Sequence, residues 1–89
     1  MNDLNNKNVI ITGASKGIGK KIAELFSNYK SNLFLISRNI DSLNQLKSKL
    51  KKNNQIVECY SADVTDSDNI NKIIKDIYQK YKKIDVLVN

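Results

Sequence analysis

The sequence predicts an α/β fold whose parallel sheet has the strand order 3-2-1-4. From Asn8 onward, four short apolar runs alternate with three longer amphipathic stretches, which is the pattern of strands joined by helical crossovers. The second run, Leu33–Ile36, is apolar at every position, as expected for a strand that helices cover on both faces. All three glycines of the chain lie where the first run meets the first amphipathic stretch.

The strands are identified by their short length and β-branched content. Val9–Thr12 is too short for a helix and is rich in β-branched residues. Further strands are predicted at Leu33–Ile36, Gln55–Ser61 and Ile84–Val88. Right-handed crossovers then place the first two helices on one face of the sheet and the third on the other. The fourth strand keeps an unpaired edge, so we expect the isolated chain to be marginally stable or to self-associate.

Two of the helices are defined by apolar residues at helical spacing. The core-facing residues predicted for the first helix are Ile18, Ile22, Leu25, Phe26 and Tyr29. Those predicted for the third helix are Ile70, Ile73, Ile74, Ile77, Tyr78 and Tyr81. Thr65, with Asp68 three residues later, resembles a capping box at the start of the third helix.

A narrower apolar stripe marks the second helix. Asn39 is a suitable N-cap, and the stripe that follows consists of Leu43, Leu46 and Leu50 among several lysines. Three apolar residues in an otherwise polar helix predict a surface position with modest burial. Cys59, in the third predicted strand, is expected to be a buried thiol.

Length and composition restrict the classes of function. A chain of 89 residues suits a single domain, residues 1–89, without a separate substrate domain. The net charge is +6, but the lysines are spread over the helices without an aromatic platform, so nucleic acid is not expected as a partner. With one cysteine and no histidine, a Cys/His metal site is excluded. No apolar run is long enough for a membrane span, and a cytoplasmic location is expected.

The loop Thr12–Gly19 joins the first strand to the first helix. Backbone N–H groups at a helix start carry roughly half a positive charge and suit a pyrophosphate. Gly13 permits a sharp turn, and Gly17 and Gly19 lack Cβ atoms that would block a ligand or a neighbouring strand. Ile18 is expected to anchor the helix start in the core.

The glycine spacing of this loop is G-x-x-x-G-x-G. A Walker A loop is excluded, because Ala14 and Lys21 would occupy the positions that need Gly and Ser/Thr. The loop resembles that of the short-chain dehydrogenase/reductase family, which reads Thr-Gly-x-x-x-Gly-x-Gly. Asp63-Val64-Thr65 and Asp85–Asn89 are similar to two further motifs of that family. The resemblance covers residues 8–89 and implies the truncated half of a doubly wound, three-layer Rossmann-type fold.

The same resemblance implies a cofactor site at the carboxyl ends of the strands. Asp63 would accept a hydrogen bond from the adenine amino group, and Val64 would pack on the adenine ring. The residues implied to surround the cofactor phosphates are Gly13, Ser15, Lys16, Gly17, Ile18 and Gly19. A plain turn or helix-entry role is the alternative for Asp63.

The end of the second strand bears on which dinucleotide is bound. An acidic residue there would bind the ribose hydroxyls of NAD and repel a 2′-phosphate. Ser37 and Arg38 stand there instead, and Arg38 is the only arginine of the chain. Its guanidinium can hold a phosphate in a bidentate way, and Lys16 can approach the same group. We therefore expect NADP in preference to NAD; a solvated Arg38 beside the second helix is the alternative.

The family resemblance implies an oxidoreductase that reduces carbonyls or oxidises alcohols, acting on a small-molecule substrate as a homo-oligomer. Its catalytic Ser and Tyr-x-x-x-Lys would follow a fifth strand, so no catalytic residue is assigned and the 89 residues alone are expected to be inactive. Tyr78 and Lys82 match the Tyr–Lys spacing, but Tyr78 belongs to the apolar helix face and is predicted to be a core residue. A non-catalytic dinucleotide-binding or redox-sensing module is the alternative function.

One local departure from the family concerns the turn before the second strand. The family commonly has Gly-Ala where this chain has Lys30-Ser31. A lysine in the left-handed conformation that glycine favours costs about 1 kcal/mol. The sequence therefore predicts a slightly strained turn away from the cofactor site.

Overall fold

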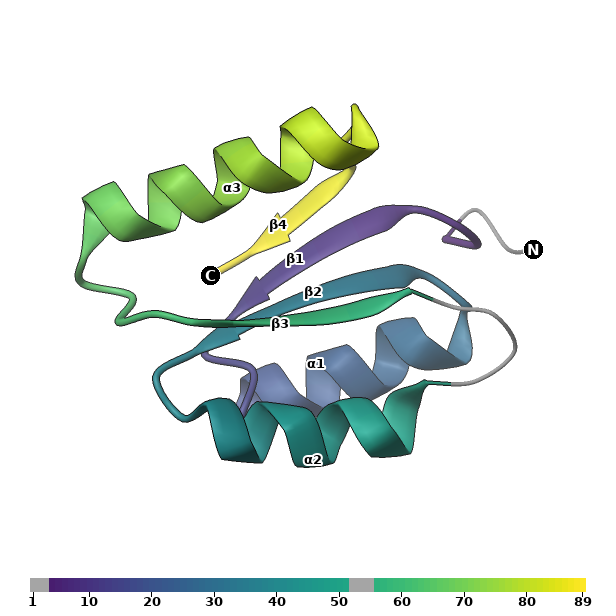
Figure 1. The fold of residues 1–89 in the computed structure, drawn as a ribbon. Coiled ribbons are helices and arrows are strands. Elements are labelled where there is room, and N and C mark those ends of the chain that lie inside the picture. Colours follow the sequence, from purple (N-terminus) through teal and green to yellow (C-terminus); the bar gives the residue numbers. More distant parts are fainter. Residues whose placement is uncertain (1–3, 52–55) are drawn as a thin grey trace.

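A computed structural model of the protein, which describes residues 4–51 and 56–89, confirms the α/β architecture and the strand order (Figure 1). The elements are β1 (Asn8–Thr12), α1 (Gly17–Asn28), β2 (Asn32–Ser37), α2 (Ile40–Leu50), β3 (Val57–Ser61), α3 (Ser67–Tyr81) and β4 (Val86–Val88). All strand pairs are parallel, in the order β3-β2-β1-β4. Helices α1 and α2 cover one face of the sheet and α3 lies over the other (Figure 1). The predicted start of the third strand at Gln55 lies outside the described residues.

The strand β2 forms the centre of the core. Leu33 and Leu35 pack on the side of α1 and α2, whereas Phe34 and Ile36 pack on the side of α3. All four side chains are fully buried. The middle of an interior parallel strand that meets helices on both faces favours apolar side chains, which explains the apolar run between the polar ends of the strand.

The helix α1 packs on the sheet through a face that matches the predicted one only at Ile22 and Phe26. Its buried residues are Ala23 and Ser27, and Ile22 and Phe26 lie partly buried beside them. The predicted core residues that are exposed instead are Ile18, Leu25 and Tyr29. The assignment of Ile18 to the core is wrong, since this side chain is 78% exposed. Because the small residues Ala23 and Ser27 are the buried ones, the centre of the contact face is shifted away from Ile18 and Leu25.

The helix α2 lies at the surface and buries only its narrow apolar stripe, as the sequence predicts. Its buried residues are Leu43, Leu46 and Leu50, which pack in the core that α1 shares. Because the three leucines follow one line along the helix, a narrow contact is sufficient to bury each of them. The predicted N-cap is confirmed, because the Asn39 side chain accepts a hydrogen bond of 3.0 Å from the Ser42 N–H.

The start of α3 is capped by a different residue from the one predicted. The Asp66 side chain accepts a hydrogen bond of 3.2 Å from the Asn69 N–H. Thr65 instead donates from both its N–H and its hydroxyl to Asp63. The capping box at Thr65 is therefore wrong, because Asp63 captures Thr65 in a tight turn and the helix begins one residue later.

The end of α3 also differs from the prediction. Ile73 and Ile77 are buried as expected, but Tyr78 is 55% exposed and is not a core residue. Tyr81 provides the aromatic contact with the core instead, and its ring centroid lies 5.0 Å from that of Phe34. None of the helices within residues 4–51 and 56–89 is long and apolar enough to cross a membrane.

The Cys59 thiol is only half-buried, so the prediction of a buried thiol is wrong. Its Sγ lies 3.4 Å from the Leu43 carbonyl oxygen, to which the thiol donates. Burial raises the pKa of Cys59, with Lys47 opposing the shift. The thiol is thus protonated at neutral pH and is a poor nucleophile.

The turn before β2 shows the strain that the sequence predicts. Lys30 has φ of 59°, in the left-handed region that glycine occupies without steric cost. We expect Lys30→Gly to raise the free energy of unfolding by about 0.5–1 kcal/mol, measured by urea denaturation. The control is Lys21→Gly at an exposed position inside α1, where glycine should destabilise the protein by a similar amount. A destabilised Lys30→Gly variant would contradict the strain at this turn.

A carboxylate joins the edge strand β3 to the end of α3. Glu58 accepts hydrogen bonds from the Tyr60 hydroxyl at 2.6 Å and from the Lys80 ammonium at 3.1 Å, and a further short one from the Tyr81 hydroxyl. Burial acts to raise the pKa of Glu58, but these hydrogen bonds outweigh it and hold the pKa below its ordinary value. The ionised carboxylate therefore stabilises the contact between the strand and the helix.

Acid should weaken this contact. Because the pKa of Glu58 is lower in the folded state, its stabilisation is present above the ordinary glutamate pKa and is lost as the pH falls through the folded-state pKa. We expect Glu58→Gln to cost about 1–2 kcal/mol of stability at pH 7 and to lose less stability than the parent between pH 5 and about pH 3. Urea denaturation at several pH values measures both effects. Glu24→Gln, at an exposed position on α1, is the control, and equal behaviour of the two variants would refute the role of Glu58.

Candidate functional site

A cavity of about 480 Å³ opens where the carboxyl ends of the parallel strands β2 and β3 meet the loop after β1. The residues predicted from sequence that line it are Gly13, Ser15, Lys16, Ser37, Arg38, Asp63 and Val64. Gly17, Ile18 and Gly19 do not line this cavity; they form the first turn of α1, directly after the loop. The fold thus brings three separate sequence segments to one end of the sheet, where open α/β folds bind ligands.

Each of the three glycines in the loop is favoured at its position by the local backbone geometry. Gly13 and Gly17 have φ of 64° and 62°, a conformation that costs other residues about 1–2 kcal/mol. Gly19 has an ordinary φ, but a Cβ atom there would lie 2.2 Å from the Gly13 carbonyl oxygen. Gly19 is therefore needed for close packing of the helix start on its own loop. A Cβ at Gly17 would meet no atom within 4 Å, so the predicted steric role applies to Gly19 and not, within the protein itself, to Gly17.

The N-terminal end of α1 carries a partial positive charge that the side chains of its cap and first turn do not neutralise. Lys16 is the N-cap residue, with extended backbone and no capping hydrogen bond from its side chain, and the first turn contains no acidic residue. The first N–H groups of a helix have no partner within the helix, and the helix dipole favours an anion beside them. This end of α1 is therefore suited to a phosphate.

A chain of hydroxyl groups links the glycine loop to the tip of β2. The buried Ser37 hydroxyl accepts from the Asn39 N–H at 3.3 Å and donates to the Ser15 hydroxyl oxygen at 2.8 Å. The bond between the two hydroxyl groups holds the Ser15 side chain against the buried Ser37. Ser37 therefore orients Ser15 at the cavity wall.

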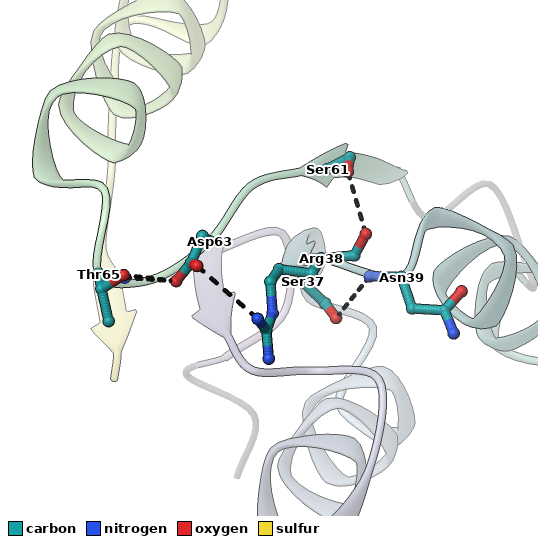
Figure 2. Close-up of polar contacts among 6 residues, drawn as sticks. All are labelled: Ser37, Arg38, Asn39, Ser61, Asp63 and Thr65. Atoms are coloured by element: carbon teal, nitrogen blue, oxygen red, sulfur yellow. Dashed lines mark hydrogen bonds and ion pairs between the residues drawn. The ribbon is translucent and has the colours of Figure 1, made fainter.

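Backbone hydrogen bonds hold the three segments together. The Ala14 N–H donates to the Ile36 carbonyl at 3.3 Å, and the Ala62 N–H donates to the Ser37 carbonyl at 3.0 Å. The Ser61 hydroxyl donates to the Arg38 carbonyl at 3.2 Å (Figure 2). The cavity walls are thus fixed by the sheet, so a ligand meets a preformed site.

Arg38 and Asp63 both line the cavity, and their side chains point toward each other (Figure 2). The Arg38 Nη1 lies 3.8 Å from the Asp63 Oδ2, and the side chains are 80% and 43% exposed. Asp63 Oδ1 accepts from the Thr65 N–H at 2.9 Å and from the Thr65 hydroxyl at 2.8 Å. These hydrogen bonds, with a smaller contribution from Arg38, lower the pKa of Asp63. Asp63 is consequently ionised at neutral pH and held in one orientation.

Sequence reasoning missed four residues of the cavity wall. They are Asn39, Ser42, Ala62 and Thr65. Asn39, Ala62 and Thr65 adjoin predicted site residues, and the Ser42 N–H donates the N-cap bond to Asn39, so their proximity could have been inferred from the strand ends. Tyr78 is not among the lining residues, because α3 leads away from this end of the sheet (Figure 1). Within the two described stretches, no cluster of His, Cys, Asp and Glu could hold a metal ion.

Relatives of the chain are similar to it over nearly all or all of its length. An uncharacterized oxidoreductase of Staphylococcus saprophyticus is 37% identical over 89 residues, which cover 100% of this chain and 35% of the relative. The 3-ketodihydrosphingosine reductase of Bos taurus is 40% identical over 88 residues, covering 91% of this chain and 26% of the relative. The chain therefore spans about a third or less of the length of these two relatives.

A solved structure has the same arrangement of strands and helices. The L-sorbose reductase of Gluconobacter frateurii, complexed with NADPH and L-sorbose, matches 98% of this chain and 34% of its own chain, with a TM-score of 0.84 and 29% identity. The sequence profile of the short chain dehydrogenase family matches residues 7–89. These matches agree with the glycine spacing and the parallel sheet, and the chain belongs to the short chain dehydrogenase family.

Proposed function

We propose that this chain is the dinucleotide-binding part of an NADP(H)-dependent oxidoreductase that reduces carbonyls or oxidises alcohols. The observation that carries the proposal is the cavity at which the glycine loop, the tip of β2 and the end of β3 converge. Bound NADPH would supply a hydride to the substrate. The domain comprises residues 1–89, and the protein of which it forms part is a homo-oligomer acting on a small molecule.

The residues of the cavity fit the parts of the cofactor. The uncapped start of α1, with Gly17, Ile18 and Gly19, suits the pyrophosphate. Asp63 lines the cavity and would accept a hydrogen bond from an adenine amino group, and Val64 beside it is exposed for contact with the ring. Ile18, exposed at the start of the helix, is likewise free to contact the ligand.

The preference for NADP rests on the tip of β2. Arg38 and Lys16 both line the cavity, and a ribose 2′-phosphate carries about −1.5 to −2 charges. Ser15, which is held by Ser37, adds a hydroxyl group to the same wall. The residue that ends β2 is Ser37, so no carboxylate at this position repels the phosphate.

Calorimetric titration of the chain with NADP and with NAD tests the proposal. We expect both to bind, with NADP at least about tenfold tighter, because one charged hydrogen bond contributes roughly 1.5–3 kcal/mol. Binding of NADP should weaken as salt concentration rises. Equal affinities would contradict the NADP preference, and absence of binding by either dinucleotide would contradict the proposed function as a whole.

A further inference from the structure

Arg38 and Asp63 form an ion pair, although the proposed function assigns them to different parts of the ligand. The proposed function assigns Arg38 to the 2′-phosphate and Asp63 to adenine, yet their charged atoms lie 3.8 Å apart. Both residues line the same cavity. A ligand phosphate that binds Arg38 must therefore draw its guanidinium away from the Asp63 carboxylate, which already attracts it.

The two partners differ in how firmly they are held. Asp63 is fixed by two hydrogen bonds from Thr65 to its Oδ1, which leaves Oδ2 directed at Arg38 (Figure 2). The Arg38 backbone is held by the Ser61 hydroxyl, but its side chain is 80% exposed. The carboxylate is thus the stationary partner, and the guanidinium is the one that must move.

We propose that Asp63 is a specificity-determining residue that competes with the ribose 2′-phosphate for Arg38 and thereby limits the preference for NADP over NAD. This inference rests on the proposed function. An exposed ion pair contributes about 0.2–1 kcal/mol, which corresponds to an effect of up to about fivefold on affinity. Only ligands that carry the 2′-phosphate use Arg38 in this way, so the competition lowers their affinity selectively.

Two small ligands isolate this effect. Adenosine 5′-monophosphate and adenosine 2′,5′-bisphosphate share the adenine and the 5′-phosphate and differ only at the 2′ position. The ratio of their dissociation constants therefore cancels any change in adenine binding when Asp63 is altered. Titrations of the parent chain, Asp63→Asn, Arg38→Ala and the double variant form a double-mutant cycle.

Asp63→Asn is expected to increase the preference for the 2′,5′-bisphosphate by about two- to fivefold, and to have no such effect when Arg38 is alanine. Asparagine at position 63 keeps an oxygen for the turn with Thr65, so folding should be retained. Asp68→Asn changes the net charge equally, on a residue outside the cavity wall, and should leave the ratio unchanged.

Three results would overturn the inference. They are an unchanged or reduced ratio in Asp63→Asn, an equal gain in the presence and absence of Arg38, and an equal gain in Asp68→Asn. The last two would indicate general charge repulsion without competition for Arg38. Failure of the proposed function would look different, because the parent chain would then bind neither nucleotide, and the inference would fall with it.

Discussion

Replacing Gly19 with alanine is expected to lower the free energy of unfolding by about 2–3 kcal/mol and to abolish tight nucleotide binding. The added Cβ would lie 2.2 Å from the Gly13 carbonyl oxygen and 3.2 Å from the Ala14 Cα. Both neighbours are backbone atoms, so the clash can be relieved only by shifting the loop or the start of α1. Either shift displaces the N–H groups that face the phosphate. Urea denaturation and calorimetric titration with NADP measure the two effects.

Gly17→Ala is the matched control for this steric argument. Position 17 has a left-handed φ of 62° but open space around a Cβ, so alanine should cost only the backbone strain of about 1–2 kcal/mol. The Gly19 variant should therefore be the less stable of the two. If Gly19→Ala is as stable as the parent chain, the close packing of helix on loop is refuted.

The second large effect is expected from Arg38→Asp, which should weaken NADP binding by about two orders of magnitude. The substitution removes a charged hydrogen-bond donor, worth roughly 1.5–3 kcal/mol, and places a carboxylate beside a phosphate of about −1.5 to −2 charges. NAD should bind at least as well as before, because a carboxylate at the end of β2 suits the ribose hydroxyls. Titration of the variant with both dinucleotides measures the reversal.

A control separates this local effect from the loss of net positive charge. Lys72→Asp makes the same change in charge at an exposed position of α3 outside the cavity wall. It should alter the ratio of NADP to NAD affinity by less than about threefold, because exposed charges beyond a Debye length of about 8–10 Å are screened. An unchanged preference in Arg38→Asp would refute the assignment of Arg38 to the 2′-phosphate.

The sequence was sufficient to predict the strands because their patterns are local. Leu33–Ile36 has no polar residue, and this alone distinguishes an interior strand from an edge strand. The glycine loop could be located for a similar reason, since Gly13 and Gly17 both occupy backbone conformations that few other residues tolerate. The strand order followed from the match of four strands and three helices to the first half of a doubly wound fold.

Side-chain burial on the helices was predicted less well, because it depends on distances between elements. Ile18 and Tyr78 fit the helical period, yet both are exposed. In α1 the buried face contains Ala23 instead of Ile18, and in α3 it is Tyr81 that packs its ring against Phe34. The predicted capping box at Thr65 does not form, because Asp63 accepts the hydrogen bond from the Thr65 N–H. Such competition between neighbouring polar groups has no signature in periodicity.

In the candidate site, too, the sequence identified single residues but not the contacts between them. Arg38 and Asp63 could each be identified from their places after β2 and β3, but the ion pair between them is a property of the fold. The link from Ser37 to Ser15 likewise joins segments 22 residues apart in sequence. Contacts of this kind determine how the site recognises a ligand, and they require coordinates.

The most direct test of the central claim is a titration of the ¹⁵N-labelled chain with NADP, followed by amide chemical shifts. We predict that the largest changes occur at Gly13, Ser15, Lys16, Arg38 and Asp63, and that amides at the far end of α3, around Tyr78, stay unchanged. Saturable changes confined to the far end of α3, or no change at the glycine loop and the ends of β2 and β3, would contradict the account.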